Sequence, residues 1–277
     1  MERGDVPYLL NGAFRRLAYV SFGNPDNPPV ICVHGLTRNG RDFDVLAQAL
    51  ADTYFVICPD LPGRGASDWL PEGGLYQPAT YVVALGHLLA AIGRPVVWIG
   101  TSLGGMCGMA LAATEGSPIR QLVLNDIGPF IPRAALARIR DYMALGDPPS
   151  FADLAEVEAY LRRVHAPFGP MTDEDWAHMA RHSSRAGADG LLRLHYDPAI
   201  AEPIRASEPA DTDLWALWPA IKAPVLVIRG AESDLLLAET VEQMEVSRAE
   251  SYVVPGVGHA PSLTDEATIA RIRRFLT

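Results

Sequence analysis

The feature that most constrains this fold is a serine between two glycines, placed after an apolar run and before a helical pattern. Gly100, Ser102 and Gly104 form a G-x-S-x-G motif within the stretch WIGTSLGGMC. A strand that enters a helix through one residue turns so sharply that the positions two residues away have no room for side chains. Such a turn exposes the Ser102 hydroxyl above the carboxyl ends of the strands, where open α/β sheets bind ligands. The motif therefore predicts a nucleophilic serine rather than a helix N-cap.

Short apolar runs alternate with longer helical patterns through the first half of the chain. Strand patterns cover residues 13–22, 29–35, 53–60, 94–100 and 119–129, and helical patterns cover 40–52, 78–93 and 102–116. This alternation favours parallel strands joined by right-handed crossovers. Helices on both faces of the sheet would explain why most of the strand runs are apolar throughout. The chain is therefore predicted to be an α/β protein.

The pattern changes between residues 130 and 215, where we expect an inserted helical lobe. Helical patterns cover residues 131–146, 150–165 and 172–187, and no convincing strand lies among them. The sheet pattern resumes at 223–234 and 250–259, with helices expected over 238–246 and from 264 onward. The predicted division is a core of residues 1–129 and 216–277 with a helical cap of residues 130–215.

A serine hydroxyl is a weak nucleophile without a base, so a histidine is expected within its reach. His259 is favoured among the seven histidines because its Gly-rich loop, VVPGVGHAP, follows the last predicted strand. His34 abuts Gly35 and is expected to position the backbone. His178 and His182 have a spacing that suits a metal, but no nearby acidic or cysteine ligand completes a set, so a solvated helix face is predicted. The remaining histidines, His87, His165 and His195, have no motif and are expected to be structural.

Two carboxylates at strand ends compete to orient the base. Asp234 follows the strand after the inserted lobe, and Asp126 follows the strand before it. Both satisfy the chain order Ser, Asp, His. Asp234 is preferred because its Gly-x-x-x-Asp loop would let the carboxylate reach the His259 loop, whereas Asp126 would instead fix a turn before Pro129.

An oxyanion hole needs two backbone amides beside the nucleophile. Leu103 directly follows the serine, and Leu36 lies in the loop after the strand CVHG. A second glycine-rich turn, DLPGRGASD at residues 60–68, resembles a phosphate-binding loop only loosely, since it lacks a lysine and a following helix pattern. It is predicted to be structural.

Composition limits the partners of the chain. The net charge of −10 and the pI near 5.1 repel phosphate backbones and anionic headgroups, which argues against nucleic acid or a membrane surface as partners. A signal-peptide pattern is not apparent, and no apolar run reaches about 18 residues. Cys32, Cys58 and Cys107 lie in apolar segments without metal-ligand spacing, which predicts buried free thiols in a cytoplasmic protein. The expected partner is a small-molecule substrate, with no metal or organic cofactor, and the oligomeric state stays open.

Five stretches resemble, in order and spacing, the landmark motifs of the α/β-hydrolase fold superfamily: VHGLTRNGRDF, CPDLPGRGASD, WIGTSLGGMCGMALA, RGAESD and VPGVGHAPSL. The resemblance implies a mostly parallel sheet of the eight-stranded type, flanked by helices, with an inserted helical cap. It also implies Ser102 as nucleophile, Asp234 as acid, His259 as base, and the amides of Leu36 and Leu103 as oxyanion donors.

The same resemblance implies a capped serine hydrolase that cleaves a small to medium carboxylic ester or lactone through an acyl-enzyme on Ser102. Haloalkane dehalogenases and epoxide hydrolases carry aspartate at the nucleophile position, so Ser102 argues against both. A carbon-carbon bond hydrolase is an alternative, although those enzymes usually have Asn and Trp where this chain has Thr101 and Ala260. A non-catalytic ligand receptor is a second alternative. Four aromatic residues of the cap are expected to pack in its core or to line the pocket: Phe151, Tyr160, Phe168 and Trp176.

Overall fold

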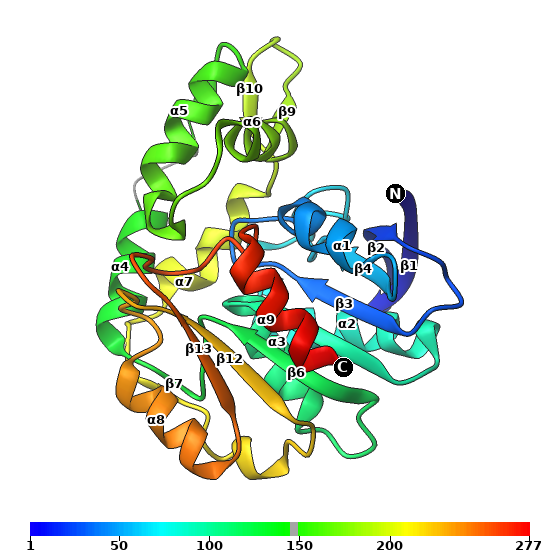
Figure 1. Ribbon diagram of the computed structural model, residues 1–277. Helices are drawn as coiled ribbons and strands as arrows, with labels where there is room; N and C mark the ends of the chain where they lie inside the picture. The colour runs from blue at the N-terminus through cyan, green and yellow to red at the C-terminus, as the bar shows by residue number, and fades with distance from the viewer. Residues whose placement is uncertain (145–148) are drawn as a thin grey trace.

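An eight-stranded sheet forms the centre of the computed structural model, which describes residues 1–144 and 149–277 (Figure 1). The strand order is β1-β2-β4-β3-β5-β6-β12-β13. β2 is antiparallel to β1 and to β4, and the remaining neighbours pair in parallel, which confirms the predicted α/β class. The strands are β1 Glu2–Leu10, β2 Ala13–Phe22, β3 Pro29–Val33, β4 Phe55–Pro59, β5 Val96–Thr101, β6 Ile119–Asn125, β12 Val225–Gly230 and β13 Glu250–Val254.

The first strand, β1, was not predicted from the sequence. It pairs with β2 as a hairpin whose last pair is Leu10 with Ala13. Asn11 and Gly12 connect the strands with φ angles of 49° and 78°. Asn-Gly is the preferred sequence of a two-residue turn with positive φ at both positions, so this dipeptide was the signal that would have revealed the hairpin.

Helices cover both faces of the sheet (Figure 1). α1 (Asp44–Leu50) and α9 (Glu266–Leu276) pack on one face, where a core cluster forms around residues such as Leu46, Val97 and Ile272. The opposite face is covered by α2 (Pro78–Ile92), α3 (Leu103–Ala112) and α8 (Ala238–Ser247). The strands between these layers are therefore apolar on both sides, as the sequence pattern indicated.

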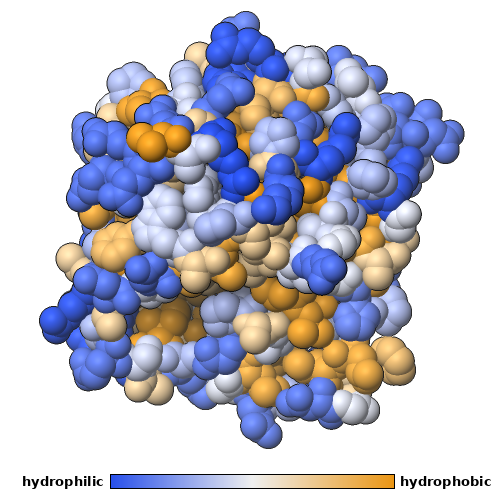
Figure 2. Space-filling view, turned by 90° about the horizontal axis from the view of Figure 1, so that it is seen from below, coloured by the Kyte–Doolittle hydropathy of each residue, from blue (hydrophilic) through white to orange (hydrophobic). Residues whose placement is uncertain are grey.

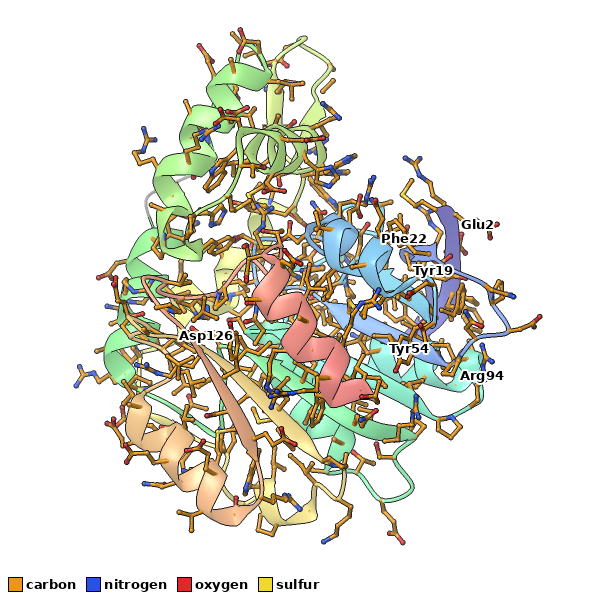
Figure 3. All side chains as sticks on the ribbon, viewed as in Figure 1. Glu2, Tyr19, Phe22, Tyr54, Arg94 and Asp126 are labelled. Atoms are coloured by element: carbon orange, nitrogen blue, oxygen red, sulfur yellow. The ribbon has the colours of Figure 1, made fainter. Side chains whose placement is uncertain are left out.

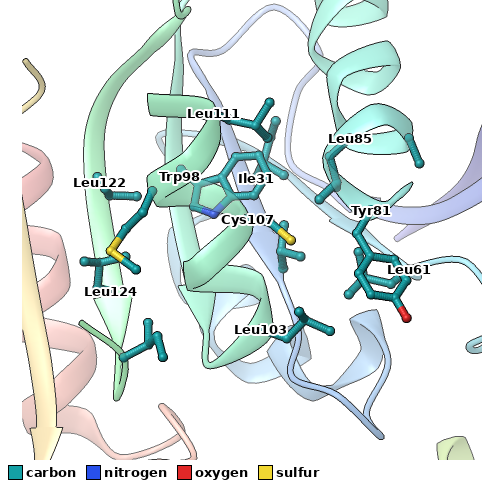
Figure 4. Packing of buried hydrophobic residues seen from close by; sticks show 14 of the residues in the cluster. Ile31, Leu61, Tyr81, Leu85, Trp98, Leu103, Cys107, Leu111, Leu122 and Leu124 are labelled. Carbon is teal, nitrogen blue, oxygen red and sulfur yellow. The ribbon is translucent and has the colours of Figure 1, made fainter. Parts of the chain in front are cut away.

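Close packing between β5 and α3 fixes the start of that helix (Figure 4). Trp98 on β5 is fully buried, and its indole N–H donates to the carbonyl oxygen of Gly104 at 3.0 Å. A Cβ atom at Gly108 would lie 2.3 Å from the indole nitrogen, so only glycine at position 108 lets α3 pack this close to Trp98. The indole thus holds the first turn of α3, which follows Ser102 directly.

The segment between β6 and β12 contains helices and several short strands. The strands form a three-stranded sheet, β8-β10-β9, and a two-stranded pair, β11-β7, although no strand was predicted here. The prediction failed because these strands are two or three residues long, too short for a period-two pattern. Of the predicted helix 131–146, residues 145 and 146 lie outside the described residues. The elements are β7 Phe130–Ile131, α4 Arg133–Met143, β8 Ser150–Phe151, α5 Leu154–Val164, α6 Asp173–His182, β9 Ser184–Ala186, β10 Leu192–Leu194, α7 Glu202–Ala206 and β11 Thr212–Asp213.

Short 3₁₀ turns occur both in the core and in the segment between β6 and β12. They cover Gly40–Phe43, Gly73–Leu75, Ala166–Phe168, Pro198–Ala201 and Trp218–Ala220.

Seen from below, the surface mixes apolar and polar side chains (Figure 2). Within the described part of the chain, no helix combines the length and the apolar character that crossing a membrane requires.

Candidate active site

Ser102 occupies a strained turn between β5 and α3. Its φ and ψ angles are 51° and −114°, a conformation that L-residues rarely adopt. The flanking glycines are required by close contacts: a Cβ atom at Gly100 would lie 2.5 Å from the carbonyl carbon of Gly104. A Cβ atom at Gly104 would lie 2.1 Å from the carbonyl oxygen of Val33. The predicted need for glycine on both sides of the serine is confirmed.

Replacing Gly104 with alanine should therefore destabilise the protein and displace Ser102. The new methyl group meets the backbone of Val33, which cannot rotate away, so we expect a loss of about 1–3 kcal/mol in the free energy of unfolding. A displacement of about 1 Å at the serine should lower kcat for any reaction that uses the Ser102 hydroxyl by about 100-fold. Urea unfolding and steady-state kinetics measure the two effects.

Gly86→Ala is the matched control for Gly104→Ala. Gly86 also lies inside a helix, α2, but a Cβ atom added there would meet nothing within 4 Å. Alanine there should raise the free energy of unfolding by about 0.5–1 kcal/mol, because glycine is a poor helix former. A Gly104→Ala variant as stable and active as Gly86→Ala would contradict the packing argument.

His259 connects Ser102 to a buried carboxylate. It lies in the loop between β13 and α9, and its Nε2 atom is 3.1 Å from Ser102 Oγ. Its Nδ1 atom is 2.6 Å from Oδ2 of Asp126. An ionised carboxylate only accepts hydrogen bonds, so Nδ1 carries the proton and the neutral ring presents Nε2 as an acceptor to the serine hydroxyl. This arrangement gives the hydroxyl a base that is already in the reactive tautomer.

Asp126 lies just beyond the end of β6, between the sheet and the inserted segment (Figure 3). Its side chain is fully buried, and its φ angle of 54° is in the left-handed region that aspartate tolerates better than most residues. The backbone N–H of Gly230 donates to Oδ1 at 2.9 Å, and the Ser233 hydroxyl donates to Oδ2 at 2.6 Å. These bonds and the histidine compensate the buried charge and fix the orientation of the carboxylate.

The preference for Asp234 as the partner of His259 was wrong. Asp234 points to solvent, with 52% of its side chain exposed, and forms a two-bond ion pair with Arg138 of α4 at 2.6 and 2.7 Å. The end of β12 and the loop after it do reach the site, but they do so through Gly230 and Ser233 rather than through Asp234. Asp126 takes the position that the sequence argument assigned to Asp234.

Asn125 is a positioning residue that the sequence argument did not identify. Its buried side-chain amide donates to Thr101 Oγ1 at 3.0 Å and to the carbonyl oxygen of Pro261 at 2.9 Å. The backbone carbonyl oxygen of Asn125 accepts a hydrogen bond from the backbone N–H of Ser102. Asn125 therefore joins the serine turn to the loop that carries His259. No local motif distinguishes it from any other asparagine at a strand end.

The loop that carries Leu36 is held by buried donors. The Nε2 atom of His34 accepts from the N–H of Leu61, so Nδ1 donates to the carbonyl oxygen of Gly35. Burial lowers the pKa of His34 to about 3, which keeps the ring neutral, and the predicted backbone-positioning role is confirmed. The fully buried Arg64, from the turn predicted to be structural, donates to the carbonyl oxygen of Leu36 at 2.8 Å.

Two cavities meet at Ser102. One has a volume of about 440 Å³ and is lined by Leu36, Leu103 and mostly apolar side chains; we call it the apolar cavity. Its charged lining residues, Arg140 and Glu208, pair with each other at 3.2 Å. The apolar lining includes Met106, Ile127, Ile131, Leu136, Ile204 and Leu235.

The second cavity, about 310 Å³, also contains Ser102 and Leu36, and we call it the arginine cavity because Arg38 and Arg138 line it. His259 lines the arginine cavity as well. Of the four aromatic residues expected in the cap core or pocket, Phe168 lines this cavity. Phe151 and Tyr160 pack against each other with ring centroids 5.3 Å apart, and Trp176 is buried.

The structure corrects the prediction that no acidic ligand lies near His178 and His182. Asp44 of α1 approaches both histidines of α6, and one potential ligand atom from each residue lies within 4.8 Å of the others. The guanidinium of Arg41 already contacts this group, since Nε donates to Asp44 at 2.9 Å and Nη1 lies 3.2 Å from His182 Nδ1. Burial, together with Arg41, lowers the pKa of His182 to about 4. The Arg41–Asp44 ion pair therefore lies against α6, which contacts it through the rings of His178 and His182.

The chain resembles known hydrolases along its whole length. The sequence pattern of the alpha/beta hydrolase family matches residues 30–272. A 3-hydroxybutyrate-oligomer hydrolase from Cupriavidus necator is 45% identical, with 99% of this chain and 97% of the relative covered. A 2-(acetamidomethylene)succinate hydrolase from Mesorhizobium japonicum is 29% identical over 90% of this chain and 88% of its own. The crystal structure of an alpha/beta hydrolase from Novosphingobium aromaticivorans superposes with a TM-score of 0.87 at 37% identity, covering 99% of this chain and 98% of that one.

Proposed function

Because this chain belongs to the alpha/beta hydrolase family, we propose that it cleaves carboxylic esters through an acyl-enzyme on Ser102. The observation that carries the proposal is the line of hydrogen bonds from Asp126 through His259 to Ser102. A receptor that only bound a ligand would not need a buried carboxylate, a fixed imidazole tautomer and a strained serine in one line. These three groups are what nucleophilic acyl transfer requires.

In the first half-reaction Ser102 Oγ attacks the ester carbonyl while His259 Nε2 takes the hydroxyl proton. Asp126 stabilises the imidazolium that forms. The backbone amides of Leu36 and Leu103 are the proposed donors to the oxyanion, and Leu103 adds the positive end of the α3 dipole. Collapse of the tetrahedral intermediate breaks the bond to the alcohol oxygen, which receives the proton from His259. In the second half-reaction a water activated by His259 attacks the acyl-enzyme and releases the acid.

The proposed substrate is a short oligoester of a hydroxy acid, of the kind named for the Cupriavidus relative. An ester within an oligomer has a chain on both sides of the reacting carbonyl. The two cavities that meet at Ser102 offer separate space for those two chains. A site with one closed cavity would instead suit an ester with a small alcohol.

The proposal is tested with the linear trimer of 3-hydroxybutyrate and a fluorophosphonate probe. The protein should release 3-hydroxybutyrate from the trimer. The probe should modify the protein at one site, Ser102, as located by mass spectrometry of its peptides. Probe-treated protein should no longer cleave the trimer, because a phosphonylated serine cannot form the acyl-enzyme. Cleavage that survives complete labelling of Ser102 would contradict the mechanism. Absence of both cleavage and labelling would overturn the proposed function.

A further inference from the structure

The two cavities at Ser102 have different roles if the proposed ester hydrolysis is correct. His259 lines the arginine cavity but is not among the residues that line the apolar cavity. The departing alcohol oxygen must lie within hydrogen-bond reach of His259 Nε2 to receive its proton. The leaving group therefore extends into the arginine cavity, and the acyl chain extends into the apolar cavity beside Leu103.

In the described part of the chain, the two charged side chains that line the arginine cavity are Arg38 and Arg138, and each is held by a carboxylate outside the cavity lining. Asp234 accepts hydrogen bonds from Nε and Nη2 of Arg138, and Asp42 accepts from Nε and Nη2 of Arg38. These two-bond pairs fix the guanidinium planes. In Arg138 the pair uses Nε and Nη2 and leaves Nη1 outside it, so a rigid donor remains available.

The surroundings of Arg38 favour an anion rather than a second cation. Its side chain is only 5% exposed, and Nη1 lies 3.4 Å from Nε2 of His165. Burial and the charge of Arg38 lower the pKa of His165 well below its usual value, so this ring is neutral and accepts from the guanidinium. Among the residues that the structure describes, no aspartate or glutamate lines the arginine cavity.

We propose that the arginine cavity binds a leaving group that carries a free carboxylate. In an oligoester of hydroxy acids, this property belongs to the unit at the carboxyl end of the chain. The ester bond that breaks is then the last one before that end: Ser102 Oγ bonds to the carbonyl carbon, and the terminal hydroxy acid leaves with the proton from His259. The inference rests on the proposed function and narrows its substrate to oligoesters with an ionised end, cut one unit at a time.

The test compares the linear trimer of 3-hydroxybutyrate with the same trimer whose terminal carboxylate is a primary amide. The amide removes the charge without adding an ester. Wild-type protein should show a kcat/KM for the acid at least about tenfold above that for the amide, because a charge-assisted hydrogen bond is lost. When only the terminal unit of the acid trimer carries ¹³C, the first monomer released should be labelled.

Arg138→Gln should reduce the preference for the acid over the amide toward unity. The loss should fall mainly on KM for the acid, and kcat/KM for the amide should fall by a clearly smaller factor than kcat/KM for the acid. Arg193→Gln is the matched control, because Arg193 also forms a two-bond pair, with Asp189, but lines neither cavity. That variant should keep the wild-type preference. Loss of kcat/KM by the same factor on both substrates in Arg138→Gln would overturn the inference.

A measurement on the wild-type protein gives a second test that does not depend on how the variant folds. The 3-hydroxybutyrate anion should inhibit competitively with a Ki at least about tenfold below that of 3-hydroxybutyramide. Equal inhibition by the two compounds, together with equal cleavage of the two trimers, would overturn the carboxylate site while leaving the esterase proposal intact. Failure to cleave either trimer would overturn both.

Discussion

Replacing Ser102 with alanine should lower kcat for ester hydrolysis by at least about 10⁴-fold. Alanine removes the oxygen that forms the acyl-enzyme, while the base and the backbone amides remain. The fold should persist because no hydrogen bond of the turn depends on the hydroxyl: the Ser102 N–H donates to Asn125, and its carbonyl accepts from Gly105 and Met106. The measurement is kcat on p-nitrophenyl butyrate and on the 3-hydroxybutyrate trimer, with thermal unfolding as the check of the fold.

Ser251→Ala is the control for the loss at Ser102. Ser251 lies on β13 and donates to Glu245, and it lines neither cavity at the site. Its replacement should leave kcat within about twofold of wild type, because surface substitutions of this kind have small effects. If Ser102→Ala keeps more than about a hundredth of wild-type kcat on both esters, another group attacks the carbonyl.

Asp126→Asn should lower kcat by about 10³- to 10⁴-fold at neutral pH. An amide oriented to donate to Nδ1 of His259 places the imidazole proton on Nε2, where it faces the serine hydroxyl, and the ring then cannot act as the base. Asparagine tolerates the left-handed backbone at this position, so the turn itself should survive. The N–H of Gly230 and the hydroxyl of Ser233 would compete for the one remaining oxygen, and the melting temperature should fall as well.

Asp234→Asn gives the contrast that separates the two candidate acids. Asp234 bonds to Arg138 and not to His259, so kcat on a neutral ester should fall by less than about threefold, in keeping with the small contribution of an exposed ion pair. The comparison uses p-nitrophenyl butyrate, whose leaving group carries no carboxylate. A severe loss in Asp234→Asn with near-normal activity in Asp126→Asn would contradict the hydrogen-bond geometry and favour Asp234 as the acid.

The turn that exposes Ser102 could be predicted because its signal is local. Gly100 and Gly104, the strand before them and the helix after them all lie within about twenty residues. The clash that a Cβ atom would make at either glycine is a property of that turn. His259 was found because a glycine-rich loop follows a recognisable strand. The parallel sheet was predicted for the same reason, since each strand and each crossover helix carries its own periodicity.

The carboxylate that contacts His259 could not be predicted from the sequence because both aspartates follow strands that are adjacent in the sheet. β6 pairs with β12, so both candidates leave the sheet at the same edge. The choice depends on which side chain of the β12 loop turns inward. Ser233 does, and Asp234 is drawn outward to Arg138, which comes from a helix 96 residues away along the chain. The contact between Asp44 and the histidines of α6 was missed for the same physical reason, because the partners belong to distant segments.

The position of Asp126 before the inserted segment has a consequence for how such enzymes diversify. Ser102 and Asp126 stand at the ends of the paired strands β5 and β6, and the chain leaves for β7, α4 and the elements up to β11 only after both are in place. Ser102 and Asp126, the proposed nucleophile and acid, thus lie on one uninterrupted stretch of the chain. An exchange of the segment from β7 to β11 between relatives would replace about half of the wall facing the ester while keeping the distance between these two groups. That half of the wall can then change without altering the stretch that carries Ser102 and Asp126.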